Sequence, residues 1–256
     1  YTVFGVHPTL GELANALLGA ATVVVLMVAV ERAVDRSTAI VAGAILAVLP
    51  GPILWTDVLV SETLYTAVFV TVIAVVLRSR PTWGWAVGVG AAIGLGALVR
   101  GEALTWVLLP VVLWRVALPW RALLARVAVI VAAAAVVLAP WTIRNAVVMD
   151  AFVPVATNAS QTLWSGHHPG ATGAQTYPPA DFEEQFSPDL PERELEASAA
   201  LRDDAIEYLV THPLRELQLI PLKLIHLNRG DSYALDWVNA PGTGQKPPLS
   251  PIVAER

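Results

Sequence analysis

The chain of 256 residues contains no cysteine and has few charged side chains. The absence of cysteine excludes a disulfide framework, a thiol nucleophile and a Cys-ligated metal. Charged residues make up 14% of the sequence, whereas soluble domains average about 25%. So few charges leave too little polar surface to cover a water-soluble globule, which argues against a soluble protein.

Several motifs that announce a binding or catalytic site are also missing. The sequence has no phosphate-binding Walker loop, no zinc-helix motif and no Ser/His/Asp set. The adjacent His167 and His168 form a poor metal site, because neighbouring side chains point apart. Arginines outnumber acids before Asp150 and acids dominate after it, and neither half is typical of a nucleic-acid binder. We therefore expect no metal, no cofactor and no nucleic-acid partner.

Apolar residues are abundant instead, and they are clustered. They make up 55% of the chain, and the mean hydropathy is +0.60. Many lie in runs of roughly 16 to 22 residues, the length that crosses a hydrocarbon core of about 30 Å. The sequence therefore predicts an all-α, polytopic membrane helix bundle.

Short polar or proline-rich breaks separate the apolar runs. The runs cover residues 13–30, 38–49, 58–77, 83–114 and 127–138. Basic clusters precede and follow the long run 83–114, and the positive-inside rule places both in the cytoplasm. That run then contains two helices with Arg100 at an outer turn. The prediction is about six transmembrane helices in a cell membrane, most simply the bacterial cytoplasmic membrane, with both ends of the bundle outside.

These patterns divide the chain into five segments. Residues 1–12 are expected to be the end of a truncated outer loop in an internal fragment, and residues 13–149 the transmembrane bundle. An irregular outer loop is expected at 150–190, outer or interfacial helices at 191–230, and a Pro/Gly-rich tail at 231–256. Pro191 suits a helix start. Residues 214–228 are too polar to span and suit a helix at the membrane surface. All of 150–256 is thereby predicted on the outer face.

Glycines recur along one apolar run at spacings that suit helix packing. Gly84 and Gly88 are four residues apart, as are Gly90 and Gly94. Small residues at this spacing let neighbouring helix backbones approach closely in lipid. Packing is the interpretation that we adopt for all four.

Polar side chains near the outer turns are the candidate site residues, because such groups are costly in a bilayer. Asp57 and Glu62 either cap a helix in water or form an acidic rim that orients a basic partner or a hydroxyl group. Arg100 either extends to the lipid headgroups or holds the phosphate of a lipid-linked substrate. Glu102 is expected to pair with Arg100 or to orient it.

Two further positions complete the candidate set. Arg144, with Trp141 and Asn145 at the predicted exit of the last helix, is a second candidate for lipid phosphate, and an anchoring role is equally compatible. Asn158 matches a glycosylation acceptor, a common chance match, and is kept as an acceptor or rim residue.

Several short sequence segments, in the same order along the chain, resemble those of the GT-C membrane glycosyltransferases that use polyprenyl-phosphate sugars. They are closest to bacterial protein mannosyltransferases and to aminoarabinose transferases of lipid A. The likeness covers about residues 7–230. The segments are LANALLGA (13–20), LPGP (49–52), LVSETL (59–64), GLGALVRGEA (94–103), APWTIRN (139–145), FVPVATN (152–158) and LWSGHHPGATG (163–173).

The resemblance implies a transferase that moves a sugar from a polyprenyl-phosphate carrier to an acceptor at the extracytoplasmic face. Arg100 then matches the basic residue that follows a small-residue-rich helix in this family, and would hold the phosphate. The resemblance also implies an acidic general base in an outer loop, expected upstream of Tyr1. Glu62 and Glu102 are therefore not assigned that role. The expected partners are membrane lipid, the lipid-linked sugar and an acceptor of unknown kind.

Two other functions remain open on the sequence. A transporter or flippase for a lipid-linked or anionic substrate would predict internal repeats and charges near helix midplanes. A non-catalytic assembly subunit would use the acidic region 181–204 as its partner surface.

Overall fold

The computed structural model describes residues 8–179 and 191–227. Every regular element in these residues is helical, which confirms the predicted all-α class. The chain divides into two compact units, with the boundary between Pro140 and Trp141. The tail predicted at 231–256 and residues 181–190 of the acidic region lie outside the described residues.

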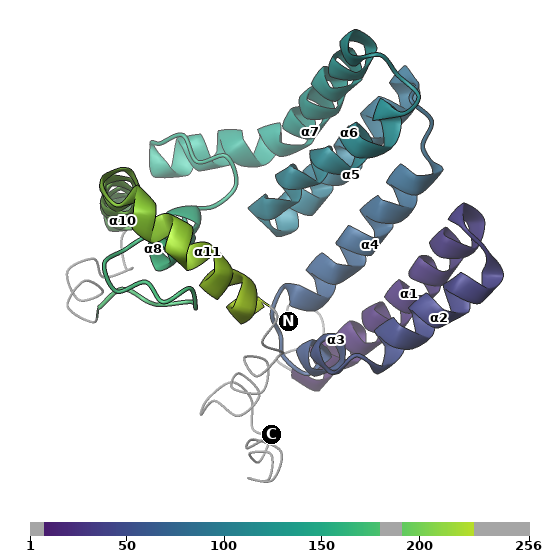
Figure 1. Cartoon of the computed structure of the whole chain (residues 1–256), viewed down its shortest axis with the longest axis horizontal. Coiled ribbons are helices and arrows are strands. Elements are labelled where there is room, and N and C mark those ends of the chain that lie inside the picture. The colour runs from purple at the N-terminus through teal and green to yellow at the C-terminus, as the bar shows by residue number, and fades with distance from the viewer. Residues whose placement is uncertain (1–7, 180–190, 228–256) are drawn as a thin grey trace. The chain divides into compact units, whose positions relative to one another are not determined.

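The described part of the first unit is a series of helical segments that reverse direction from one to the next, as Figure 1 shows. In chain order its elements are α1 (Pro8–Ala33), α2 (Arg36–Val48), α3 (Pro50–Thr56), α4 (Glu62–Arg78), α5 (Trp83–Val99), the 3-10 helix η1 (Gly101–Val107), α6 (Leu108–Arg115) and the first part of α7 (Trp120–Met149). Helix α1 begins at Pro8, so the prediction of a loop as far as residue 12 is wrong from Pro8 onward.

Two helices, α1 and α7, are long and apolar enough to cross a membrane. Helices α2 and α3 together pass the same test but are bent by 54°. The described residues therefore contain two spans, or three if the bent pair is one span, and the predicted number of six stays a prediction. The bend lies at Leu49, where Pro50 ends one helix and begins the next, because proline has no N–H to donate yet fits a first helical turn.

Close contacts fix the direction of the passes in the first unit. Gly43 of α2 lies against Met27 of α1, so these neighbours run antiparallel. Asn15 of α1 donates a hydrogen bond to the carbonyl of Val58, 3.1 Å away, just before α4. Gly90 of α5 lies against Ile130 of α7. Successive segments of the bundle therefore run in opposite directions, so that α1 is parallel to α4 and α5 is parallel to α7.

The second unit holds the end of α7, then α8 (Ala159–Gly166), α10 (Pro191–Thr211) and α11 (Pro213–Leu227). Helix α8 was not predicted, because the region 150–190 was interpreted as wholly irregular. Helix α7 continues through Pro140 to Met149, beyond the apolar run 127–138 and as far as the predicted end of the bundle. The helix start at Pro191 is confirmed, and α11 begins at Pro213.

Candidate functional site

Two of the predicted site residues, Glu62 and Arg100, meet at one end of the α4–α5 hairpin. Glu62 occupies the first turn of α4, where a carboxylate is favoured by the positive end of the helix dipole. Arg100 terminates α5 in an extended conformation, with φ −150° and ψ 130°. Because the two helices run antiparallel, residues 38 positions apart come together at the same end.

The contact between them is an ion pair with spare hydrogen-bonding capacity. Arg100 Nη1 donates to Glu62 Oε1 at 3.2 Å, and the side chains are 36% and 26% exposed. The other carboxylate oxygen of Glu62 is buried, and no donor from the described residues reaches it. A guanidinium carries five N–H donors, so Arg100 keeps donors for a further anion at its exposed edge.

Aromatic side chains support the arginine. The guanidinium lies over the ring of Tyr65, 5.5 Å from the ring centroid. Trp106 of η1 packs on Tyr65 and Phe69, with ring centroids 5.3 and 4.9 Å apart. Gly96 makes room for this indole, since a Cβ there would lie 2.7 Å from the ring. This aromatic support was not predicted from the sequence. The four-residue spacing of Tyr65 and Phe69, which places them on one helix face, could have indicated it.

The other two candidates in this unit do not join the pair. Glu102 is exposed in η1 and forms no ion pair with Arg100 among the described residues, and the alternative that it orients Arg100 stays a prediction. Asp57 is the C-terminal cap residue of α3, and the N-terminal cap residue of α4 is Ser61, so Asp57 does not cap the start of α4.

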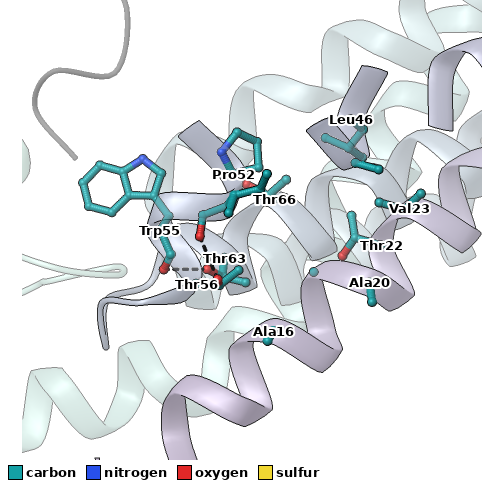
Figure 2. Close-up of a pocket in the computed structure, with 13 residues that line it drawn as sticks. Ala16, Ala20, Thr22, Val23, Leu46, Pro52, Trp55, Thr56, Thr63 and Thr66 are labelled. Carbon is teal, nitrogen blue, oxygen red and sulfur yellow. Dashed lines mark hydrogen bonds between the residues drawn. The ribbon is translucent and has the colours of Figure 1, made fainter. Parts of the chain in front are cut away.

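An apolar cavity of about 290 Å³ lies among α1, α2, α3 and α4 (Figure 2). Four threonines are among its lining residues: Thr22, Thr56, Thr63 and Thr66. Each threonine hydroxyl group donates a hydrogen bond to a backbone carbonyl three to eight residues earlier in the chain. Thr63 directly follows Glu62, so the cavity and the ion pair share the beginning of α4. Arg100 and Glu62 do not line the cavity, but the mostly apolar lining suits an apolar chain.

In the second unit, the predicted set around Arg144 forms a structural clamp. Asn145 is buried; its amide donates to the Val153 carbonyl at 3.1 Å and its oxygen accepts from Arg144 Nη1 at 3.1 Å. Trp141 Nε1 donates to the carbonyl of Val155 at 2.8 Å. These bonds fasten the segment after α7 to the end of that helix. Asn158 is exposed at the start of α8 and makes no capping bond there.

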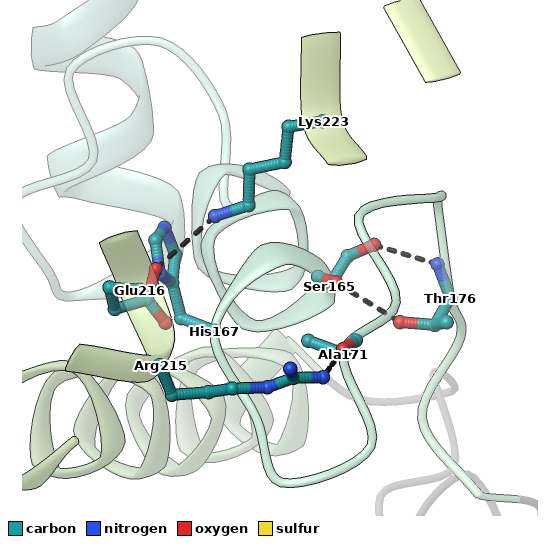
Figure 3. A network of polar contacts seen from close by, with 7 residues as sticks. All are labelled: Ser165, His167, Ala171, Thr176, Arg215, Glu216 and Lys223. Atoms are coloured by element: carbon teal, nitrogen blue, oxygen red, sulfur yellow. Dashed lines mark hydrogen bonds and ion pairs between the residues drawn. The ribbon is translucent and has the colours of Figure 1, made fainter. Parts of the chain in front are cut away.

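A polar network lies between α11 and the loop after α8 (Figure 3). It was not predicted from the sequence. Glu216 Oε2 lies 2.8 Å from His167 Nδ1 and 3.3 Å from Lys223 Nζ. Arg215 donates to the carbonyl of Ala171 at 3.4 Å. These contacts join residues 49 and 44 positions apart in the chain, so no local sequence pattern could predict them. The loop packs tightly, because a Cβ on Gly173, whose φ is +90°, would lie 2.9 Å from the α11 backbone.

The two adjacent histidines do point apart. His167 faces Glu216, whereas His168 stacks on Trp164 with ring centroids 4.2 Å apart and pairs with the Thr176 hydroxyl at 2.9 Å. Burial lowers the pKa of His168, and the Asp204 carboxylate opposes this in part. Within the described residues, no three His, Asp or Glu side chains gather as a metal site.

These observations define a class: a helical chain with two or three segments of membrane-spanning length and an ion pair at the end of an apolar hairpin. No protein-family model, curated protein or solved structure matches the chain.

Proposed function

We propose that the chain is part of a membrane glycosyltransferase that moves a sugar from a polyprenyl-phosphate carrier to an acceptor at the extracytoplasmic face. The observation that carries the proposal is the half-exposed Arg100 guanidinium, held by Glu62 at the end of α4 that also contributes Thr63 and Thr66 to an apolar cavity. In this proposal the chain crosses the membrane six times, and residues 150–256 lie on the outer face.

Arg100 has the geometry that this chemistry needs at the leaving group. Transfer breaks the bond between sugar C1 and the carrier phosphate oxygen, while a new bond forms from C1 to an acceptor hydroxyl oxygen. Negative charge grows on the phosphate as it leaves, and a fixed cation at a low-dielectric surface stabilises it. Glu62 and Tyr65 position the guanidinium in advance, so little reorganisation is needed.

The acceptor proton must pass to a base, and no described carboxylate is assigned to that role. Glu62 is occupied by Arg100, and Glu102 lies exposed in η1 without an ion pair in the described part of the chain. Arg144 contributes as an anchor in this proposal, because its bond to Asn145 belongs to the clamp at the end of α7.

The apolar cavity fits the remaining part of the donor. Its lining is mostly aliphatic, and the threonine hydroxyl groups are already bonded to helix carbonyls. An isoprenoid chain requires contacts of this kind and no polar partners. A cavity of about 290 Å³ accommodates the portion of the chain next to the phosphate.

Replacement of Arg100 tests the proposal. In the full-length protein reconstituted with a polyprenyl-phosphate sugar, Arg100→Ala should reduce transfer by roughly 100-fold or more, as loss of a charge-stabilising donor does. Arg100→Lys should restore only part of the activity, because an ammonium lacks the planar fork. Arg121→Ala is the matched control, since this exposed arginine lies at the opposite end of the passes.

Binding of polyprenyl phosphate, measured by native mass spectrometry, separates the alternatives. The transferase proposal predicts weaker binding in Arg100→Ala and unchanged binding in Arg121→Ala. Unchanged transfer and binding in Arg100→Ala would remove Arg100 from the site. If the wild-type protein transferred no sugar but moved the carrier across vesicles, and Arg100→Ala lost that movement, a flippase would be the better assignment.

A further inference from the structure

Helix α11 presents its apolar side chains outward. Leu214 and Leu217 are 74% and 63% exposed, and Ile220 and Leu227 are also exposed. Residues 217, 220 and 227 are separated by three and seven positions, so they lie on one face of the helix. A continuous aliphatic stripe therefore runs along the outside of α11.

The opposite face of α11 is polar and faces the second unit. Glu216 and Lys223 meet His167 there, and Arg215 reaches the loop carbonyl of Ala171. Among these polar side chains Leu219 is fully buried. The helix thus has ionic groups inside and leucines outside.

This polarity is the reverse of that expected for a helix on a protein in water. A surface helix normally buries its apolar stripe and exposes its charges. Contiguous exposed apolar surface marks contact with a membrane or another protein. The apolar face of α11 therefore requires an apolar environment, either a lipid bilayer or the surface of another protein.

The connection to α7 identifies the lipid bilayer as that environment. Helix α7 has membrane-spanning length, and the second unit begins inside it, at Trp141, with no intervening linker. The second unit is thereby tethered to the membrane surface. Helix α11 has 15 residues, about 22 Å, which is too short to cross a core of about 30 Å. Arg215 and Lys223 on its polar side suit the headgroup level.

We propose that α11 lies in the plane of the bilayer surface, with Leu214, Leu217, Ile220 and Leu227 among the acyl chains of the leaflet at which α7 ends. In this position α11 holds the His167–Glu216–Lys223 network at the level of the lipid headgroups. This inference depends on the membrane location alone and stands apart from the transferase proposal.

Single-cysteine labelling tests the inference directly, because the chain has no native cysteine. Leu217→Cys and Ile220→Cys would each carry a bimane label, in full-length protein reconstituted in vesicles of neutral and anionic phospholipid. Nitroxide groups on the acyl chains should quench both labels several-fold more strongly than aqueous iodide does. Both sites are exposed, so the substitutions should leave the size-exclusion profile and helicity unchanged.

Asp203→Cys is the matched control, since Asp203 is exposed on α10 and pairs with its neighbour Arg202. Its label should be quenched by iodide and hardly by the lipid nitroxides. Iodide quenching at 217 and 220 equal to that at 203 would overturn the proposal. Protection from both quenchers would also overturn it, because the face would then be covered by protein, either another part of this chain or a second copy.

Discussion

The glycines of α5 show how differently residues with one sequence pattern are used. A Cβ on Gly90 would lie 2.3 Å from the carbonyl oxygen of Ile130, and one on Gly94 would lie 2.9 Å from that of Ala134. At Gly84 and Gly88 no atom lies within 4 Å of such a Cβ. The packing interpretation is therefore confirmed for Gly90 and Gly94, whereas Gly84 and Gly88 contact no neighbour there.

This difference gives a residue-scale prediction with an internal control. Gly90→Ala should destabilise the first unit by about 1–3 kcal/mol, the usual cost of overpacking, because backbone must move away from the new methyl group. Gly88→Ala should leave stability unchanged or raise it by about 0.5–1 kcal/mol, since alanine favours a helix. Thermal unfolding of the purified variants measures both. Equal midpoints for the two variants would contradict the close α5–α7 contact.

At the scale of single elements, helix ends and bends depended on bonds that local sequence does not reveal. The break at Arg100 was predicted from charge and confirmed. The continuation of α7 through Pro140 was not, because a proline removes one helical bond but flanking residues sustain the helix. Helix α8 was missed because Gly and Ser surround it, yet Trp164 anchors it by donating to Asp204 at 2.6 Å.

The loop that follows α8 should make the second unit sensitive to pH. The pKa of His168 is lowered from its ordinary 6.5 by burial, so the folded state disfavours the charged ring. As pH falls below 6.5 the unfolded chain gains a proton that the folded chain does not, and stability declines until the folded pKa is passed. Thermal unfolding of wild type and His168→Gln across this range measures the effect.

The unfolding midpoint of the wild type should fall more steeply with decreasing pH than that of His168→Gln. The carboxylate of Asp204 opposes the shift, so Asp204→Asn should steepen the wild-type dependence. Parallel curves for wild type and His168→Gln would show that another group governs the pH response.

At the scale of the whole molecule, the two ends of the first unit differ in chemistry. At one end two arginines lie over aromatic rings and form no ion pair among the described residues, with Arg126 3.8 Å from the Trp83 ring centroid and Arg115 4.7 Å from that of Trp120. At the other end the arginine is paired with an acid, Glu62 with Arg100. Helix α5 separates the two ends by 17 residues, about 25 Å. The orientation that the positive-inside rule predicts for these ends stays a prediction.

Membrane orientation can be measured with the same cysteine-free background. Gly101→Cys places a thiol where no atom lies within 4 Å of the Cβ position, next to the proposed phosphate site. Arg80→Cys places one at the opposite end of α5. A membrane-impermeant maleimide added to intact cells should label position 101, whereas position 80 should react only after permeabilisation. Labelling of both from one side would exclude the proposed topology and the outer-face transferase.

The sequence by itself determined the helical class, the excess of apolar residues and the main interruptions, because helix length, hydropathy and proline are local properties. It also identified Glu62 and Arg100 separately as outer-end polar residues. Their pairing, the network around Glu216 and the outward-facing leucines of α11 were decided by tertiary structure. Each depends on segments 38 or more residues apart meeting in space, and a partner's position is set by packing directions that no local pattern encodes.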